Sequence, residues 1–147
     1  FTQLANSNGL LTASLPTPEG RYDMNVNYRI EFPISPFDWF SSIILSFGYV
    51  GTRFHPIVVS LLGGKPFISL DLYHSNYFKR KMSKTWLLLK QLKLQRYCIP
   101  SKFIPLLSAD YLFKKLTSSS ALDSQLKIEA SAKYSDLHLS YLKRSFK

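Results

Sequence analysis

The sequence predicts an α/β fold in which an open parallel sheet is flanked by helices. Two apolar runs, 49–52 and 67–73, have the length and composition of buried strands. Between them, residues 54–62 form an apolar run of helical length that is followed by Gly63 and Gly64. A strand, a short helix and a second strand in this order indicate a crossover between parallel strands. The predicted sheet is therefore Rossmann-like.

Length and composition predict one folded domain. The chain has 147 residues, of which 46% are hydrophobic, and this is enough to bury a core. We expect residues 1–22, rich in Asn, Ser, Thr, Pro and Gly, to form a loop or the truncated edge of the domain that spans 23–147. Because the first residue is Phe1, we expect a partial chain. Cys98 is the only cysteine, so an internal disulfide is excluded, and a small buried hydrophobe is its expected role.

The formal net charge of +10 predicts an affinity for anions. The basic residues are spread along the chain, with one compact run at 79–81, and no nucleic-acid-binding motif accompanies them. We therefore expect a basic face that attracts anionic substrates, not a nucleic-acid groove. The longest nearly apolar stretch, 39–51, is far shorter than the roughly 20 residues that span a bilayer. No transmembrane segment is expected, and peripheral membrane contact stays open.

The other predicted elements follow from periodicity and capping. A helix should begin at Pro36, with Ser35 as its cap. Apolar residues recur along this helix at steps of three and four, and we expect them to be buried: Phe37, Phe40, Ile44 and Phe47. The remaining expectations are a half-buried strand over 24–32, a helix from Ser83 to Leu92, a short strand over 94–100, and helices over 106–116 and 121–143.

Residues 51–56 are the segment most suited to chemistry. In open parallel sheets, ligands bind at the carboxyl ends of strands, where loops lead into helix N-termini. The helix start offers backbone N–H groups to an anion, and Arg53 adds a guanidinium that can hold two oxygens. His55 can donate a hydrogen bond and exchange a proton near neutral pH, while Gly51 permits close approach of the backbone. From these residues alone, ordinary capping and surface roles explain the pattern equally well.

Residues 49–73, YVGTRFHPIVVSLLGGKPFISLDLY, resemble the most characteristic segment of the polysaccharide pyruvyl transferase family. That family's pattern is a strand ending in G-x-R-x-H, an apolar helix, a Gly, a Pro and a buried strand ending near a Tyr. The likeness extends over 33–100, with departures where Phe54 replaces an aliphatic residue and Pro56 a small one. The matching positions are Gly51, Arg53, His55, Gly64, Pro66, Tyr73 and, at the family's lysine, Lys84.

The resemblance implies the C-terminal half of a two-domain transferase of the GT-B type, with the acceptor-binding half missing. Its reaction would move a pyruvyl group from phosphoenolpyruvate to a sugar of a polysaccharide or cell-envelope glycan, forming a ketal. His55 would be catalytic, and the residues binding phosphoenolpyruvate would be Gly51, Arg53, Phe54, His55 and Lys84. Family members without a visible signal work in the cytoplasm, which is the compartment expected here, whereas eukaryotic relatives act in the secretory lumen.

Two other functions stay open. The same helix N-terminus suits a glycosyltransferase that binds a nucleotide-sugar, and the charge suits a non-catalytic basic module for polyanions. No cofactor is expected, and no metal site either, because no His, Asp or Glu cluster has ligand spacing. Asp71, inside the second buried strand, either orients a residue of the cleft or points to solvent at the sheet edge.

Overall fold

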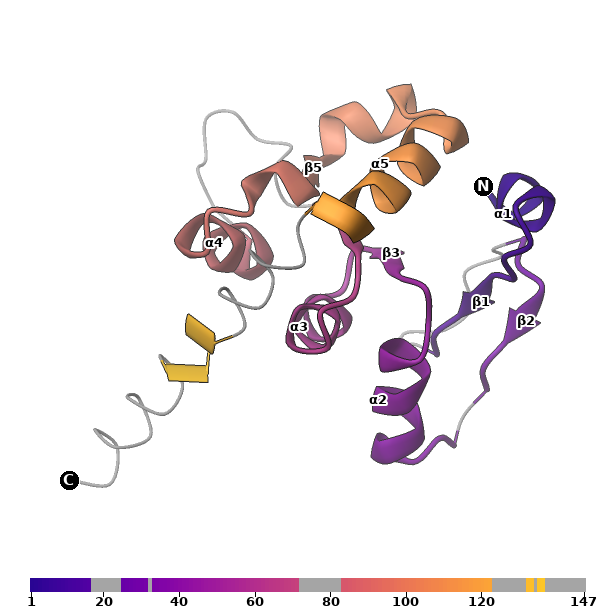
Figure 1. The fold of residues 1–147 in the computed structure, drawn as a ribbon, viewed down its shortest axis with the longest axis horizontal. Coiled ribbons are helices and arrows are strands. Elements are labelled where there is room, and N and C mark those ends of the chain that lie inside the picture. Colours follow the sequence, from indigo (N-terminus) through magenta and orange to yellow (C-terminus); the bar gives the residue numbers. More distant parts are fainter. Residues whose placement is uncertain (17–24, 32, 72–82, 123–131, 134, 137–147) are drawn as a thin grey trace.

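The fold is built on a three-stranded parallel sheet with helices on both faces (Figure 1). The computed structural model describes residues 1–16, 25–31, 33–71, 83–122, 132–133 and 135–136. The sheet has the order β3-β4-β5, and each neighbouring pair is parallel, with Tyr49 opposite Phe67 and Ser69 opposite Cys98. Its strands are β3 (Tyr49–Gly51), β4 (Phe67–Asp71) and β5 (Cys98–Pro100). The predicted α/β class and the parallel crossover from β3 to β4 are confirmed.

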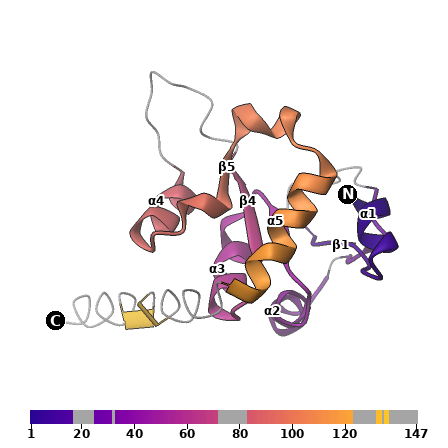
Figure 2. The same ribbon diagram turned by 45° about the horizontal axis from the view of Figure 1, so that its top comes forward.

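Three helices cover the sheet. α3 (Phe54–Leu62) connects β3 to β4, and α4 (Lys84–Gln91) lies between β4 and β5 in the chain. Both lie on one side of the sheet, and α5 (Ala109–Leu122) crosses the opposite side (Figure 2). Two short 3₁₀ helices flank β5, η1 (Gln95–Tyr97) before it and η2 (Ser101–Leu106) after it.

Alternation along the strands divides the interior into two cores. Because successive side chains of a strand point to opposite faces, Phe67 faces α3 and α4 while its neighbour Ile68 faces α5. We call the cluster beneath α3 and α4 the first core and the cluster beneath α5 the second core. The first core consists of Ile57, Leu61, Phe67, Leu88, Leu89, Leu92, Leu94, Tyr97 and Cys98. The second core consists of Ile68, Ile99 and Leu116.

Two glycines occupy positions that disfavour a side chain, one because of its backbone conformation and one because of crowding. Gly64 has a φ of 63°, and it follows α3 as the sequence predicts. The Lys65 amide then donates to the Ser60 carbonyl at 2.7 Å, which turns the chain back toward β4. At Gly48, a Cβ would come within 2.8 Å of the Pro66 carbonyl oxygen. Close approach of these two backbones brings β3 alongside β4.

The helix predicted at Pro36 is confirmed as α2 (Pro36–Ile44), but its predicted buried stripe is wrong. The Ser35 Oγ accepts from the Asp38 amide at 3.1 Å and donates to the Asp38 Oδ2 at 2.7 Å, which closes the predicted cap. α2 packs against α3 and not on the sheet, so little of its surface is covered, and Ile43 is its buried residue. The expected stripe is exposed instead: Phe37 78%, Phe40 46%, Ile44 41% and Phe47 43%.

The N-terminal region differs from the predicted loop. It contains α1 (Thr2–Ser7) and β1 (Ala13–Ser14), and β1 pairs in parallel with β2 (Tyr28–Arg29). α1 packs against α5, where the rings of Phe1 and Phe113 lie 6.2 Å apart. The loop prediction is therefore wrong for these segments, and positions 17–22 lie outside the described residues. Of the half-buried strand expected over 24–32, the described residues 25–31 contain β2, where Tyr28 is 59% exposed.

Two boundaries after α4 also differ from the prediction. The Ser83 cap and the helix after it are confirmed. Of the strand expected over 94–100, only the last part is a strand, β5, and the 3₁₀ helix η1 precedes it. α5 begins at Ala109, after the 3₁₀ helix η2, and the Ser108 Oγ accepts from the Tyr111 amide at 3.0 Å. α5 then continues through the break expected near 117–120. Most of the helix predicted over 121–143 lies outside the described residues.

Candidate functional site

The carboxyl edge of the sheet brings the predicted site residues to one end of the molecule. β3, β4 and β5 end at Gly51, Asp71 and Pro100, and parallel strands end at a common edge. α3 begins at this edge directly after β3, and α4 begins there after β4. The edge therefore presents two helix N-termini, each carrying the positive end of a helix dipole.

The turn from β3 into α3 carries four of the five predicted binding residues. Arg53 is the N-cap of α3, with extended backbone at φ −88° and ψ 138°. Its side chain is half-buried, and Phe54 packs on the first core. His55 is exposed, and its ring meets the Phe54 ring edge-on with centroids 5.8 Å apart. The fifth residue, Lys84, is the exposed first residue of α4 at the same edge, on a separate helix.

The first turn of α3 has fewer amides to offer a ligand than an ordinary helix start. A helix leaves its first backbone N–H groups without partners inside the helix. Here the Arg53 amide is bonded to the Tyr49 side chain, and Pro56 has no N–H. The amides of Phe54 and His55 are the ones that remain to meet an anion. The guanidinium of Arg53 must therefore supply a larger share of any anion binding.

Tyr49 is a residue of this turn that sequence reasoning missed. Its ring packs on the first core, and burial raises the pKa of the Tyr49 phenol above its usual value, while a hydrogen bond from the Arg53 backbone and the Arg53 charge lower it in part. Tyr49 and Gly51 are two apart on β3 and so share a face of the sheet. A Cβ on Gly51 would come within 2.6 Å of the Tyr49 Cζ. This proximity could have been predicted from the sequence, because side chains two residues apart on a strand point to the same face.

Asp71 is buried inside the edge and does not point to solvent. Only 4% of the residue is exposed. Its Oδ2 accepts a hydrogen bond from the Ser83 Oγ at 2.6 Å and lies 3.9 Å from the Cys98 Sγ. The Ser83 Oγ in turn accepts from the Trp86 amide at 3.0 Å as the cap of α4. Asp71 therefore ties the N-terminus of α4, which carries Lys84, to the end of β4.

Replacing Ser83 with alanine is expected to lower the free energy of unfolding by about 2–3 kcal/mol, since it removes a cap and a hydrogen bond to a buried acid. The matched control is Ser35→Ala, which removes the same kind of cap from α2, where the partner Asp38 is exposed. We expect about 1 kcal/mol for that control. Urea unfolding measures both. Equal losses would contradict a special role for the Asp71 contact.

Cys98 is a buried, protonated thiol, as the sequence predicts for a small core residue. It is 9% exposed. Burial, together with the nearby charge of Asp71, raises the pKa of the Cys98 thiol to about 11 from an ordinary value of 9.0. A thiol is nucleophilic as the thiolate, so this side chain is unsuited to attack on a substrate.

The raised pKa of Cys98 predicts a loss of stability in alkali. Between pH 9.0 and about 11 the unfolded thiol releases its proton while the folded thiol keeps it. Unfolding therefore becomes easier as the pH rises through this window. The Cys98→Ala variant lacks this contribution, whereas its tyrosines and lysines still titrate. Urea unfolding of both proteins at neutral pH and inside the window measures the effect. The free energy of unfolding should fall more for the unsubstituted chain than for Cys98→Ala. An equal fall in the two proteins would contradict the prediction.

Other kinds of site have little support in the described part of the chain. Its His, Cys, Asp and Glu residues form no group of three or more that could hold a metal ion. None of the helices within the described ranges is long and apolar enough to cross a membrane. The predicted basic run 79–81 falls outside those ranges. A comparison of the chain with protein-family models, with curated proteins and with solved structures found no match.

Proposed function

We propose that this chain is the donor-binding domain of a GT-B-type transferase that moves a pyruvyl group from phosphoenolpyruvate to a sugar of a polysaccharide or cell-envelope glycan. The observation that carries the proposal is the position of Arg53 and His55. They lie at the start of α3, on the carboxyl edge of a parallel sheet, within the segment that resembles the pyruvyl transferase family. This edge is where ligands bind in open α/β sheets.

The proposed donor is held by its negative charge. Phosphoenolpyruvate carries a phosphate and a carboxylate, and the Arg53 guanidinium can meet two oxygens of either group. The amides of Phe54 and His55 and the dipole of α3 add partial positive charge at the same turn. Lys84, at the start of α4, is a further cation at this edge for the second anionic group.

The proposed reaction makes a ketal at C2 of the donor. A proton adds to C3 of the enol, so that C2 becomes electrophilic, and a sugar hydroxyl attacks C2 and releases its proton. The bond from C2 to the phosphate oxygen then breaks, phosphate leaves with the bonding electrons, and a second sugar hydroxyl closes the ketal and releases its proton. His55 is exposed at the turn, where it can give or take one of these protons. Arg53 stabilises the leaving phosphate.

The test is a set of calorimetric titrations of the full chain with phosphoenolpyruvate, a nucleotide-sugar and a sulfated polysaccharide. Saturable binding of phosphoenolpyruvate, with weak or absent binding of the nucleotide-sugar, is the expected result. Tighter binding of the nucleotide-sugar would replace the proposal by a glycosyltransferase at the same edge. Binding of the polysaccharide alone, steeply dependent on salt and unchanged in an Arg53→Ala, His55→Ala variant, would replace it by a basic binding module.

A further inference from the structure

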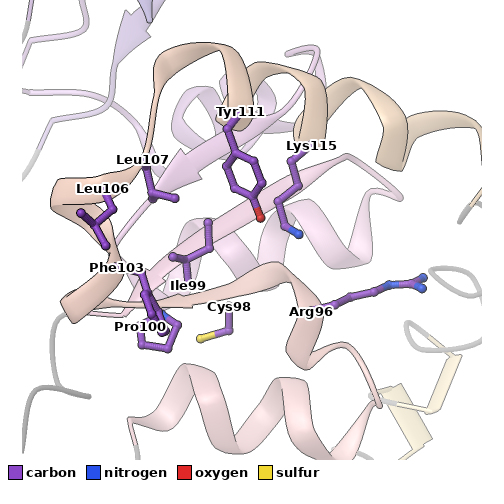
Figure 3. Close-up of a pocket in the computed structure, with 9 residues that line it drawn as sticks. All are labelled: Arg96, Cys98, Ile99, Pro100, Phe103, Leu106, Leu107, Tyr111 and Lys115. Carbon is purple, nitrogen blue, oxygen red and sulfur yellow. The ribbon is translucent and has the colours of Figure 1, made fainter.

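A cavity of about 340 Å³ lies between β5, η2 and α5 (Figure 3). None of the residues around it belongs to the turn 51–55, and Lys84 is not among them. β5 is the last strand of the sheet, and within the described residues no further strand pairs with its outer edge. The cavity thus shares no lining residue with the donor site, and it lies between the edge strand β5 and α5, which packs on the central strand β4.

One part of the cavity wall is apolar. Ile99 belongs to the second core, and Leu107 packs against that core from the segment between η2 and α5. Phe103, on η2, lies beside Pro100 at one end of the cavity and is 44% exposed (Figure 3). Leu106, at the lip, is 80% exposed. Apolar groups that stay in contact with water are stabilised when an apolar body covers them.

The other part of the wall is basic and offers hydrogen-bond donors. Tyr111 and Lys115 lie one turn apart on α5, and both side chains extend from α5 toward β5 (Figure 3). The Lys115 Nζ lies 5.6 Å from the centre of the Tyr111 ring. Arg96 also lines the cavity, but its side chain extends away from Lys115 (Figure 3), and its guanidinium carbon lies 5.2 Å from the centre of the Tyr97 ring. No Asp or Glu is among the residues that line the cavity. The wall therefore favours a negative charge beside an apolar surface.

The neighbouring Lys114 shows that this arrangement is particular to Lys115. Lys114 does not line the cavity. Its Nζ pairs with the Asp110 Oδ2 at 2.9 Å, and the two side chains are 75% and 57% exposed. The two lysines are adjacent in the sequence, so they contribute equally to the overall charge of the molecule. They differ in two respects: Lys115 lines the cavity, and Lys114 is paired with a carboxylate.

We propose that this cavity binds a small molecule with a flat apolar body and one anionic end. The apolar body packs on Ile99 and Leu107, and the anion meets the Lys115 ammonium and the Tyr111 hydroxyl. The volume of about 340 Å³ falls within the range of small-molecule sites. Phosphoenolpyruvate lacks such an apolar body, so the ligand of this cavity belongs to a chemical class different from the proposed donor.

The test uses 2-naphthoate as the probe and 2-naphthalenemethanol, its neutral counterpart, as the comparison. Both are titrated into the full chain and followed by probe fluorescence. We expect 2-naphthoate to bind more tightly than the alcohol. Lys115→Gln should weaken 2-naphthoate binding by about tenfold, because it removes a charge-assisted hydrogen bond. Lys114→Gln is the matched control and should leave the affinity within about twofold, because an exposed ion pair contributes little.

A third variant places a negative charge at the lip. Leu106→Glu changes a residue that is 80% exposed, so folding should be retained, and circular dichroism checks this. It should weaken 2-naphthoate binding and leave the alcohol unaffected. Equal losses in Lys114→Gln and Lys115→Gln, or equal affinities for the acid and the alcohol, would overturn the proposal, and so would absence of 2-naphthoate binding. Unchanged phosphoenolpyruvate binding in Lys115→Gln separates this cavity from the donor site.

Discussion

Arg53→Ala is expected to lower the affinity for phosphoenolpyruvate by roughly 10- to 100-fold, the equivalent of one or two charge-assisted hydrogen bonds. The reason is the small number of donors at this helix start. The Arg53 amide is already bonded to Tyr49 and Pro56 has no N–H, so the amides of Phe54 and His55 are left to hold the anion. Calorimetry of the variant beside the unsubstituted chain measures the loss.

Two further variants make the Arg53 result specific. Arg29→Ala removes an exposed arginine on β2, outside the carboxyl edge, and should leave the donor affinity unchanged. Arg53→Lys keeps the charge but loses the planar fork, so its affinity should fall between those of the unsubstituted chain and Arg53→Ala. Urea unfolding confirms that each variant is folded before it is titrated. An Arg53→Ala protein that is folded and retains full affinity would exclude Arg53 as the donor ligand.

Phe67→Ala is expected to lower the free energy of unfolding by about 3–5 kcal/mol, because it opens a cavity in the first core. Phe67 is 1% exposed and lies on β4, the central strand of the sheet. Its ring is 5.5 Å from that of Tyr97, so the substitution also removes an aromatic contact between β4 and η1. Urea unfolding measures the loss. The two free energies of unfolding are compared with the same dependence on urea concentration for both proteins.

Phe37→Ala is the matched control for this experiment. The amino-acid change is the same, and the helical periodicity of 36–44 predicts that Phe37 is buried, yet Phe37 is 78% exposed. We therefore expect its free energy of unfolding to change by no more than about 0.5 kcal/mol. A loss at Phe37 as large as that at Phe67 would show that the face of α2 bearing Phe37 is covered in solution.

The parts of this protein that could be predicted from the sequence depend on contacts between residues close together in the chain. The caps at Ser35 and Ser83 each involve an amide three residues away. The end of α3 depends on the glycines that follow it. The crossover from β3 to β4 also follows from local order, because a short helix between two buried strands brings them together in parallel. The turn 51–55 was identified by the same kind of local pattern.

Only the tertiary structure decided which faces are covered and which side chains meet across the edge. The periodicity of α2 marks an apolar face, but the packing of α2 on α3 buries Ile43 and leaves Phe37 exposed. The contact of Asp71 with Ser83 joins residues twelve apart, and no local pattern in the sequence pairs them. The burial of Tyr49 likewise comes from its packing on the first core, whose residues lie on α3, β4 and α4 as well as near β5. Local rules determine where elements begin and end, whereas burial depends on neighbours that are distant in the chain.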